Sequence, residues 1–202
     1  FPWSDDLTSK RLINLIYNYE FINSSSTNSE TKLLKKIILV HIFRIRLDLT
    51  YKKINEITSY DLIANILSSF ILKKTSIKDL YIIELVLKNQ IDSFGMHRSY
   101  NILEHAKFIN NLNEIKNIFL FFDFKLTNKF EETLLKMRSI LNEYFHNDGS
   151  IPLFNGSNNN YTKIINNSLN KEEYLKSRKF SDSKNGIAFY NDKNKRLFFD
   201  VV

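Results

Sequence analysis

Glycine and proline are nearly absent from this chain, and their scarcity restricts its possible folds more than any other feature. The 202 residues include only 4 glycines and 2 prolines, which β-sandwiches and β-barrels need at their many turns. Apolar residues instead recur every three or four positions over most of the length, as they do along one face of an α-helix. The sequence therefore predicts a mainly α-helical protein.

Six segments show this helical spacing. They are residues 7–22, 31–51, 59–72, 76–91, 99–113 and 130–145. Two residue pairs, Ser76 with Asp79 and Asn128 with Glu131, have the separation of a capping box at a helix start. Residues 118–124 form a dense apolar run that fits either a short helix or a strand. Short connections predict antiparallel helices, packed as a bundle or curled into an α/α toroid.

The segment 31–51 carries the longest apolar pattern, and we expect it to present one stripe to the core. The stripe comprises Leu33, Leu34, Ile37, Ile38, His41, Ile42, Ile45 and Leu49. Because His41 lies on this stripe, it is expected to be a core histidine. His105 is interpreted as a surface or packing residue, and the preceding polar run, residues 23–30, as a loop.

The helical spacing of apolar residues ends at a cluster, residues 146–157, that holds two of the four glycines and one proline. Two short apolar runs near the end, residues 187–190 and 196–202, predict a β-hairpin. Since a lone hairpin is marginal in water, we interpret it as the first strands of a truncated domain. The expected organisation is a helical domain at 1–157, a linker at 158–182 and the start of a β domain at 183–202.

Composition excludes several kinds of chemistry. The chain has no cysteine, which excludes disulfides, thiolate zinc sites and cysteine nucleophiles. No metal-ligand spacing, phosphate-binding glycine loop or serine nucleophile elbow occurs, so neither a metal nor a cofactor is expected. No run of about 18 apolar residues predicts a membrane span. The first six residues lack the features of a signal peptide and read as a start inside a longer protein, so a periplasmic and a cytoplasmic location in a bacterium both stay open.

The chain is basic, with a formal net charge of +7 and a pI near 9.4. Such a charge favours a polyanionic partner, whether nucleic acid, anionic lipid or acidic polysaccharide. It also fits the compositional bias of an AT-rich genome, because the lysines are scattered. Neither Lys10-Arg11 nor Lys35-Lys36 is dense enough to favour nucleic acid.

Three landmarks resemble the heparinase II/III-like family, in the subgroup that lacks the full lyase signature. Residues 3–13 are similar to the Trp, Asp, Thr, Arg-Leu-Ile pattern that opens a toroid helix. Residues 90–99 resemble the turn Q-x-x-D-G-G-H-x-x-R-S/N between toroid helices. Residues 148–156 resemble the exit D-G-S-x-x-x-F-N-G, and residues 183–186 the S-G-Y lead into a β-sandwich. The resemblance implies an incomplete α/α toroid followed by a truncated β-sandwich.

Family members with the full signature are polysaccharide lyases that act on uronic-acid polymers. A Tyr or His abstracts the C5 proton, an Asn or Arg neutralises the carboxylate, and the C4–O bond is eliminated, as general-base and electrostatic catalysis require. Carried onto this chain, the resemblance implies substrate contacts by Asp92, Arg98 and Asn65. It implies proton abstraction by His97 or Tyr100.

Three family positions are occupied by other residues here. The His of the turn falls on Gly95, the Tyr falls on Ile102, and the first Asn of a helix pattern N-H-x-x-x-N falls on Tyr60. We therefore expect β-elimination on, or binding of, an acidic polysaccharide by a fragment that is incomplete or inactive alone. The alternative is a non-catalytic basic helical module that binds an acidic glycan or nucleic acid, which requires basic residues gathered on one face.

Overall fold

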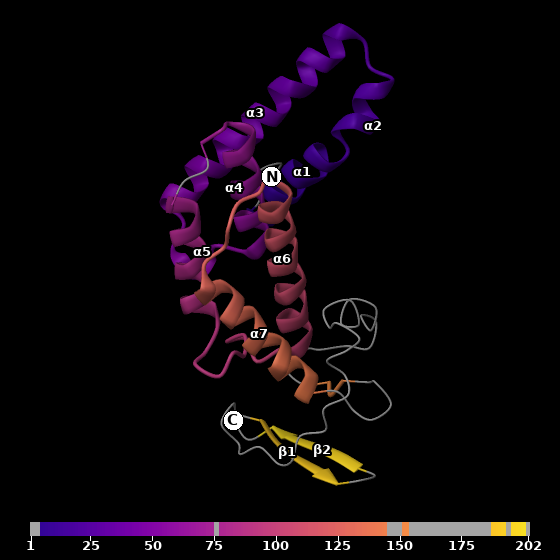
Figure 1. Cartoon of the computed structure of the whole chain (residues 1–202). Coiled ribbons are helices and arrows are strands. Elements are labelled where there is room, and N and C mark those ends of the chain that lie inside the picture. The colour runs from indigo at the N-terminus through magenta and orange to yellow at the C-terminus, as the bar shows by residue number, and fades with distance from the viewer. Residues whose placement is uncertain (1–4, 75–76, 145–150, 154–186, 193–194, 201–202) are drawn as a thin grey trace. The chain divides into compact units, whose positions relative to one another are not determined.

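The computed structural model describes residues 5–74, 77–144, 151–153, 187–192 and 195–200 (Figure 1). Within these residues it confirms the mainly α-helical fold. The helices are α1 (Asp5–Tyr17), α2 (Tyr19–Ser24), α3 (Asn28–Tyr51), α4 (Ser59–Ile71), α5 (Ile77–Gln90), α6 (Ile102–Phe121) and α7 (Asn128–Glu143), with a short 3-10 helix, η1 (Ile54–Glu56), after α3. None of the described helices is long and apolar enough to span a membrane.

The chain forms two compact units. The first unit comprises residues 1–86 and 114–125, and the second comprises residues 87–113 and 126–202. Helices α5 and α6 therefore each contribute residues to both units. The predicted boundaries at 157, 158–182 and 183 stay predictions, because the linker lies outside the described residues.

Helix α4 forms the centre of the first unit. Ser59 and each residue from Asp61 to Ser69 are buried, and α1 and α3 pack against α4 and against each other. The apolar core between them comprises Leu12, Leu34, Ile38, Ile42, Ile45 and Ala64. A helix that is buried on all sides needs apolar residues around its whole circumference, which accounts for the density of Leu and Ile in α4.

One buried carboxylate, that of Asp61, joins three segments of the first unit. It accepts hydrogen bonds from Ser9 Oγ at 2.5 Å, Lys52 Nζ at 2.8 Å and the backbone N–H of Thr58 at 3.0 Å. Asp61 is also the third residue of α4, whose first turn Thr58 caps. A buried charge is tolerated when it is paired and hydrogen-bonded in this way.

Helix α3 departs from the predicted single stripe. Leu34, Ile38 and Ile42 are buried as expected, and so is His41, whose Nδ1 lies 2.8 Å from the carbonyl oxygen of Ile37. Leu33 and Ile37, however, are exposed. They belong to a second apolar stripe on another face of the same helix, so the prediction that they line the core is wrong.

Two helix starts differ from the sequence predictions for local reasons. The predicted helix 7–22 is divided at Asn18, whose side-chain amide donates to the carbonyl of Asn14 at 2.8 Å, beside the backbone N–H of Asn18 at 3.0 Å. The predicted loop 23–30 contains the start of α3, where Thr27 and Glu30 form a capping box. Both signals were present in the sequence as short polar side chains.

Two further boundaries are settled by the structure. The run 118–124 continues α6 as far as Phe121, so its first part is helix and not strand. At α7 the capping side chain is Thr127, which accepts from the N–H of Phe130, and the predicted cap Asn128 is already helical. The predicted cap Ser76 lies outside the described residues.

The predicted hairpin forms near the end of the chain. Strands β1 (Ile187–Asp192) and β2 (Lys195–Asp200) pair antiparallel, with Ile187 opposite Asp200 and Asp192 opposite Lys195. These strands make up a sheet of two.

Candidate functional site

Four of the five predicted site residues lie in one turn of the second unit, residues 91–101, between α5 and α6. The carboxylate of Asp92 builds this turn. Its Oδ1 accepts the backbone N–H groups of Phe94 at 2.9 Å, Gly95 at 2.9 Å and Met96 at 2.8 Å. A carboxylate that accepts three backbone donors holds the turn in one conformation, so its first role is structural.

Gly95 lets the turn approach α7 closely. Its φ of +100° is a conformation that side-chain-bearing residues rarely adopt. A Cβ at this position would lie 2.9 Å from the Cβ of Lys136 on α7. The neighbouring Met96 is fully buried, so the turn is anchored to its unit by packing as well as by hydrogen bonds.

His105 lies behind the turn and is completely buried. Its Nδ1 accepts the backbone N–H of His97 at 3.1 Å, and its Nε2 lies 2.9 Å from the carbonyl oxygen of Met137 on α7. The proton of the neutral ring therefore resides on Nε2. Burial lowers the pKa of His105 to about 4, and the backbone hydrogen bond to Met137 opposes this shift. The interpretation as a surface or packing residue missed this bridging role.

His97 is partly buried, with its ring 5.3 Å from that of Phe108. Its Nδ1 lies 2.8 Å from Ser99 Oγ and accepts the N–H of Ser99 at 3.2 Å. Desolvation lowers the pKa of His97, and the negative charge of Glu104 acts in the opposite direction. The imidazole is therefore neutral near pH 7 and able to accept a proton.

Arg98 extends into solvent from this rigid turn. Its backbone N–H donates to Gln90 at 2.8 Å. Within the part of the chain that the structure describes, its guanidinium has no ion pair. An exposed guanidinium without an ion pair is available to hold a carboxylate through two parallel hydrogen bonds.

Tyr100 follows in a left-handed conformation, with φ of +51°. Its backbone N–H donates to the carbonyl of His97 at 2.9 Å, and its side chain is partly buried. Tyr144, at the end of α7, is a second phenol near the turn. Burial raises the pKa of Tyr144 well above its usual range, and the charges of Glu143 and Asp92 act in the same direction. Tyr144 therefore stays protonated and belongs to the packing behind the turn.

Asn65, the fifth predicted residue, lies on α4 in the first unit and is buried. Its side-chain amide donates to Asp79 Oδ1 at 2.9 Å, and Ser69 Oγ donates to the same oxygen at 3.0 Å. Asp79 is itself buried. A contact of Asn65 with substrate stays a prediction; in this structure its amide satisfies a buried carboxylate.

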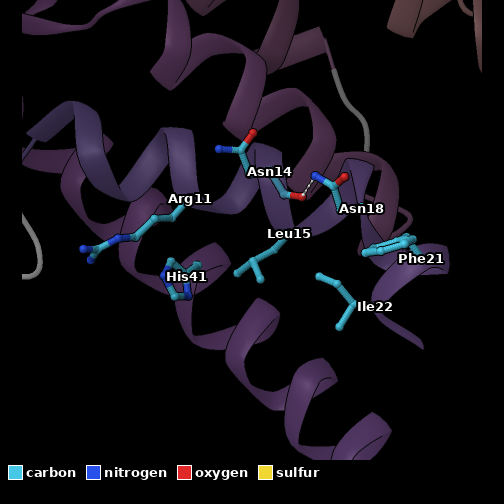
Figure 2. A pocket seen from close by; sticks show the side chains of 7 residues that line it. All are labelled: Arg11, Asn14, Leu15, Asn18, Phe21, Ile22 and His41. Atoms are coloured by element: carbon cyan, nitrogen blue, oxygen red, sulfur yellow. Dashed lines mark hydrogen bonds between the residues drawn. The ribbon is translucent and has the colours of Figure 1, made fainter. Parts of the chain in front are cut away.

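The first unit has an open hollow of about 610 Å³, which none of the predicted site residues lines. Figure 2 shows side chains of α1 and α2 around it, with His41 of α3. The lining residues are Arg11, Asn14, Leu15, Asn18, Phe21, Ile22 and His41. Polar residues at steps of three and four along α1 were a visible signal for this face. Among the described residues, no group of acidic and histidine side chains is arranged to hold a metal ion.

No family model, curated protein or solved structure matches this chain. Of the three landmarks, only the turn 90–99 is described completely. Trp3 of the first landmark lies outside the described residues, as do residues 148–150 and 154–156 of the third.

Proposed function

We propose that this chain is a heparinase II/III-like protein that binds a uronic-acid-containing polysaccharide through the turn 91–101. The observation that carries the proposal is the exposed guanidinium of Arg98 on a backbone held by Asp92 and Gly95. A rigid turn limits the entropy lost when a polymer carboxylate binds. The landmark resemblance supplies the substrate class, and the net charge of +7 favours a polyanion.

In this proposal the helices α1–α7 belong to an incomplete α/α toroid, and the strands β1 and β2 open a β-sandwich. Two features support this reading. Helices joined by short connections make up most of the described chain, and the only described strands follow them near its end. The turn 91–101 connects two successive helices, the place where the resembling family motif lies.

The chemistry of the turn favours binding over turnover. Proton abstraction at C5 needs a base with a free acceptor atom within reach of the sugar. His97 is neutral, but its Nδ1 already accepts from Ser99. Arg98 would acidify C5 by neutralising a bound uronate carboxylate. The turn offers no second cationic group to stabilise the developing enolate. We therefore propose carboxylate recognition by Arg98, with His97 and Tyr100 as candidate bases in a complete enzyme.

The proposal is tested by calorimetric titration with alginate and heparan sulfate, with dextran as an uncharged polymer. Arg98→Ala is expected to weaken binding at least about tenfold, the effect of one lost charge-assisted contact. The matched control is Lys88→Ala, which removes one exposed positive charge from the same unit and is expected to change affinity less than about twofold.

A parallel assay follows the ultraviolet absorbance of the unsaturated uronate that β-elimination produces. Product that disappears in Arg98→Ala would establish a lyase. A single-stranded oligonucleotide is included as a polyanion without carboxylates. Equal losses for Arg98→Ala and Lys88→Ala, or tighter binding to the oligonucleotide than to both glycans, would contradict the proposal.

A further inference from the structure

Helix α3 has a second apolar face that no described segment covers. We define the outer stripe as Leu33, Ile37, Val40, Arg44, Leu47 and Tyr51. Its five uncharged members are exposed by between 38% and 81%. The opposite face of the same helix is buried in the core of the first unit. A helix that is apolar on two faces normally buries both.

The spacing of the outer stripe matches a helix–helix seam. Successive members are separated by four, three, four, three and four residues. This alternation averages about 3.5 residues, the repeat at which two helices keep contact along their whole length. The series also reads the same in both directions, so the stripe is complementary to a reversed copy of itself, as a two-fold symmetric interface requires.

The exposed area is close to that of a standard protein–protein interface. Phe43, next to the outer stripe, is also largely exposed. At roughly 150–250 Å² for a large side chain, the exposed parts of the outer stripe and Phe43 amount to about 700 Å² on each copy. A standard interface buries about 800 Å² on each partner. The outer stripe runs from Leu33 to Tyr51 of α3 and is about 27 Å long, which is enough for several layers of contacts.

We propose that α3 pairs antiparallel with α3 of a second copy of this chain, through the outer stripe. This inference is independent of the proposed function. In the pairing, Leu33 meets Tyr51 of the partner subunit, and Ile37 meets Leu47 of the partner subunit. Each subunit thereby covers the whole stripe of the other.

Arg44 determines the direction of the pair. A parallel pairing in register would place two Arg44 side chains in one layer of the seam, where like charges repel. The antiparallel pairing instead places Arg44 beside Val40 of the partner subunit and leaves its ion pair with Asp48, at 3.0 Å, in place. A single polar residue in an apolar seam is a common device for selecting one register.

Sedimentation equilibrium tests whether the dimer exists. The unmodified chain is expected to be a dimer, and Leu47→Glu to raise the dissociation constant about 100-fold or more, because each dimer loses two apolar contacts. Phe121→Glu is the matched control, since Phe121 is a largely exposed apolar residue of the same unit outside α3. It is expected to stay dimeric. Far-ultraviolet circular dichroism verifies that each variant is folded.

Cysteine cross-linking tests the direction, which is straightforward because the chain has no cysteine of its own. Leu33→Cys and Tyr51→Cys are oxidised separately and as an equimolar mixture. The antiparallel pair predicts a disulfide-linked dimer only in the mixture. Linked dimers of each variant alone would overturn the antiparallel pairing. A monomeric unmodified chain would overturn the proposal altogether. If that monomer sediments with phosphatidylglycerol vesicles, the stripe contacts lipid instead of a second copy.

Discussion

The Nε2 atom of His105 lies 2.9 Å from the backbone carbonyl oxygen of Met137, so a buried imidazole connects α6 to α7. The other ring nitrogen accepts the N–H of His97 and thereby supports the turn that carries Arg98. The bond that Nδ1 accepts requires the neutral ring, whereas Nε2 can donate to the carbonyl in either protonation state. The site geometry and the stability of the second unit therefore depend on the same side chain.

Acid is expected to destabilise the protein through His105. Its pKa is about 4 in the folded protein and near 6.5 in an unfolded chain, so the unfolded state binds more protons between these values. The free energy of unfolding is therefore highest above pH 6.5, falls as the pH decreases towards 4, and loses about 3 kcal/mol over that window. Urea unfolding at several pH values measures the fall. His105→Gln should flatten it, and an unchanged slope would contradict this role.

Gly95→Ala is expected to destabilise the protein by about 2 kcal/mol or more, because φ of +100° and the contact with Lys136 both disfavour a Cβ. Ser93→Ala, in the same turn and exposed, is the control and should change stability by less than about 0.5 kcal/mol. Thermal unfolding of both variants provides the comparison. Equal stability of the two would show that the turn relaxes around an added methyl group.

Asp92→Ala is expected to release three backbone N–H groups and to destabilise the protein by about 2 kcal/mol. Asp92→Asn retains an acceptor oxygen and should have a smaller effect. Hydrogen exchange of the amides of Phe94, Gly95 and Met96 is the specific readout, since Asp92 Oδ1 accepts from all three. Unchanged exchange in Asp92→Ala would mean that packing alone holds the turn.

Thr127→Ala is expected to cost about 1 kcal/mol, the usual loss for a helix N-cap, because Thr127 Oγ1 accepts from the N–H of Phe130. The sequence instead suggested Asn128 as the cap of α7. Asn128→Ala should change stability little, as this residue is exposed within the first turn. Chemical unfolding of the two variants distinguishes them, and the reverse order of effects would restore the sequence-based assignment.

Much of the fold was predictable because helices depend on neighbouring residues. The periodicity of α4 and the break after α5 required no tertiary information. The boundaries that were missed, at Asn18, Thr27 and Thr127, depend on which of several polar side chains forms the local hydrogen bond. Several neighbouring Ser, Thr and Asn residues can cap a helix equally well in isolation, and packing selects among them.

The candidate site was predictable only in part. Residue types and spacing placed Asp92, His97, Arg98 and Tyr100 in one turn because they are close in sequence. Asn65, which the resemblance also implied as a substrate contact, lies on a distant helix, where its amide donates to Asp79. The importance of His105 was missed because its partner, the carbonyl of Met137, is 32 residues away.

The sequence by itself determined the helical class, most helix positions and the hairpin, since periodicity and turn chemistry act over a few residues. Only the tertiary structure decided which face of α3 is buried, and which polar groups satisfy Asp61 and Asp79. It also decided that His105 is neutral. The physical reason is that burial and desolvation depend on segments distant in sequence, whereas a hydrophobic pattern shows that a face is apolar but not what covers it.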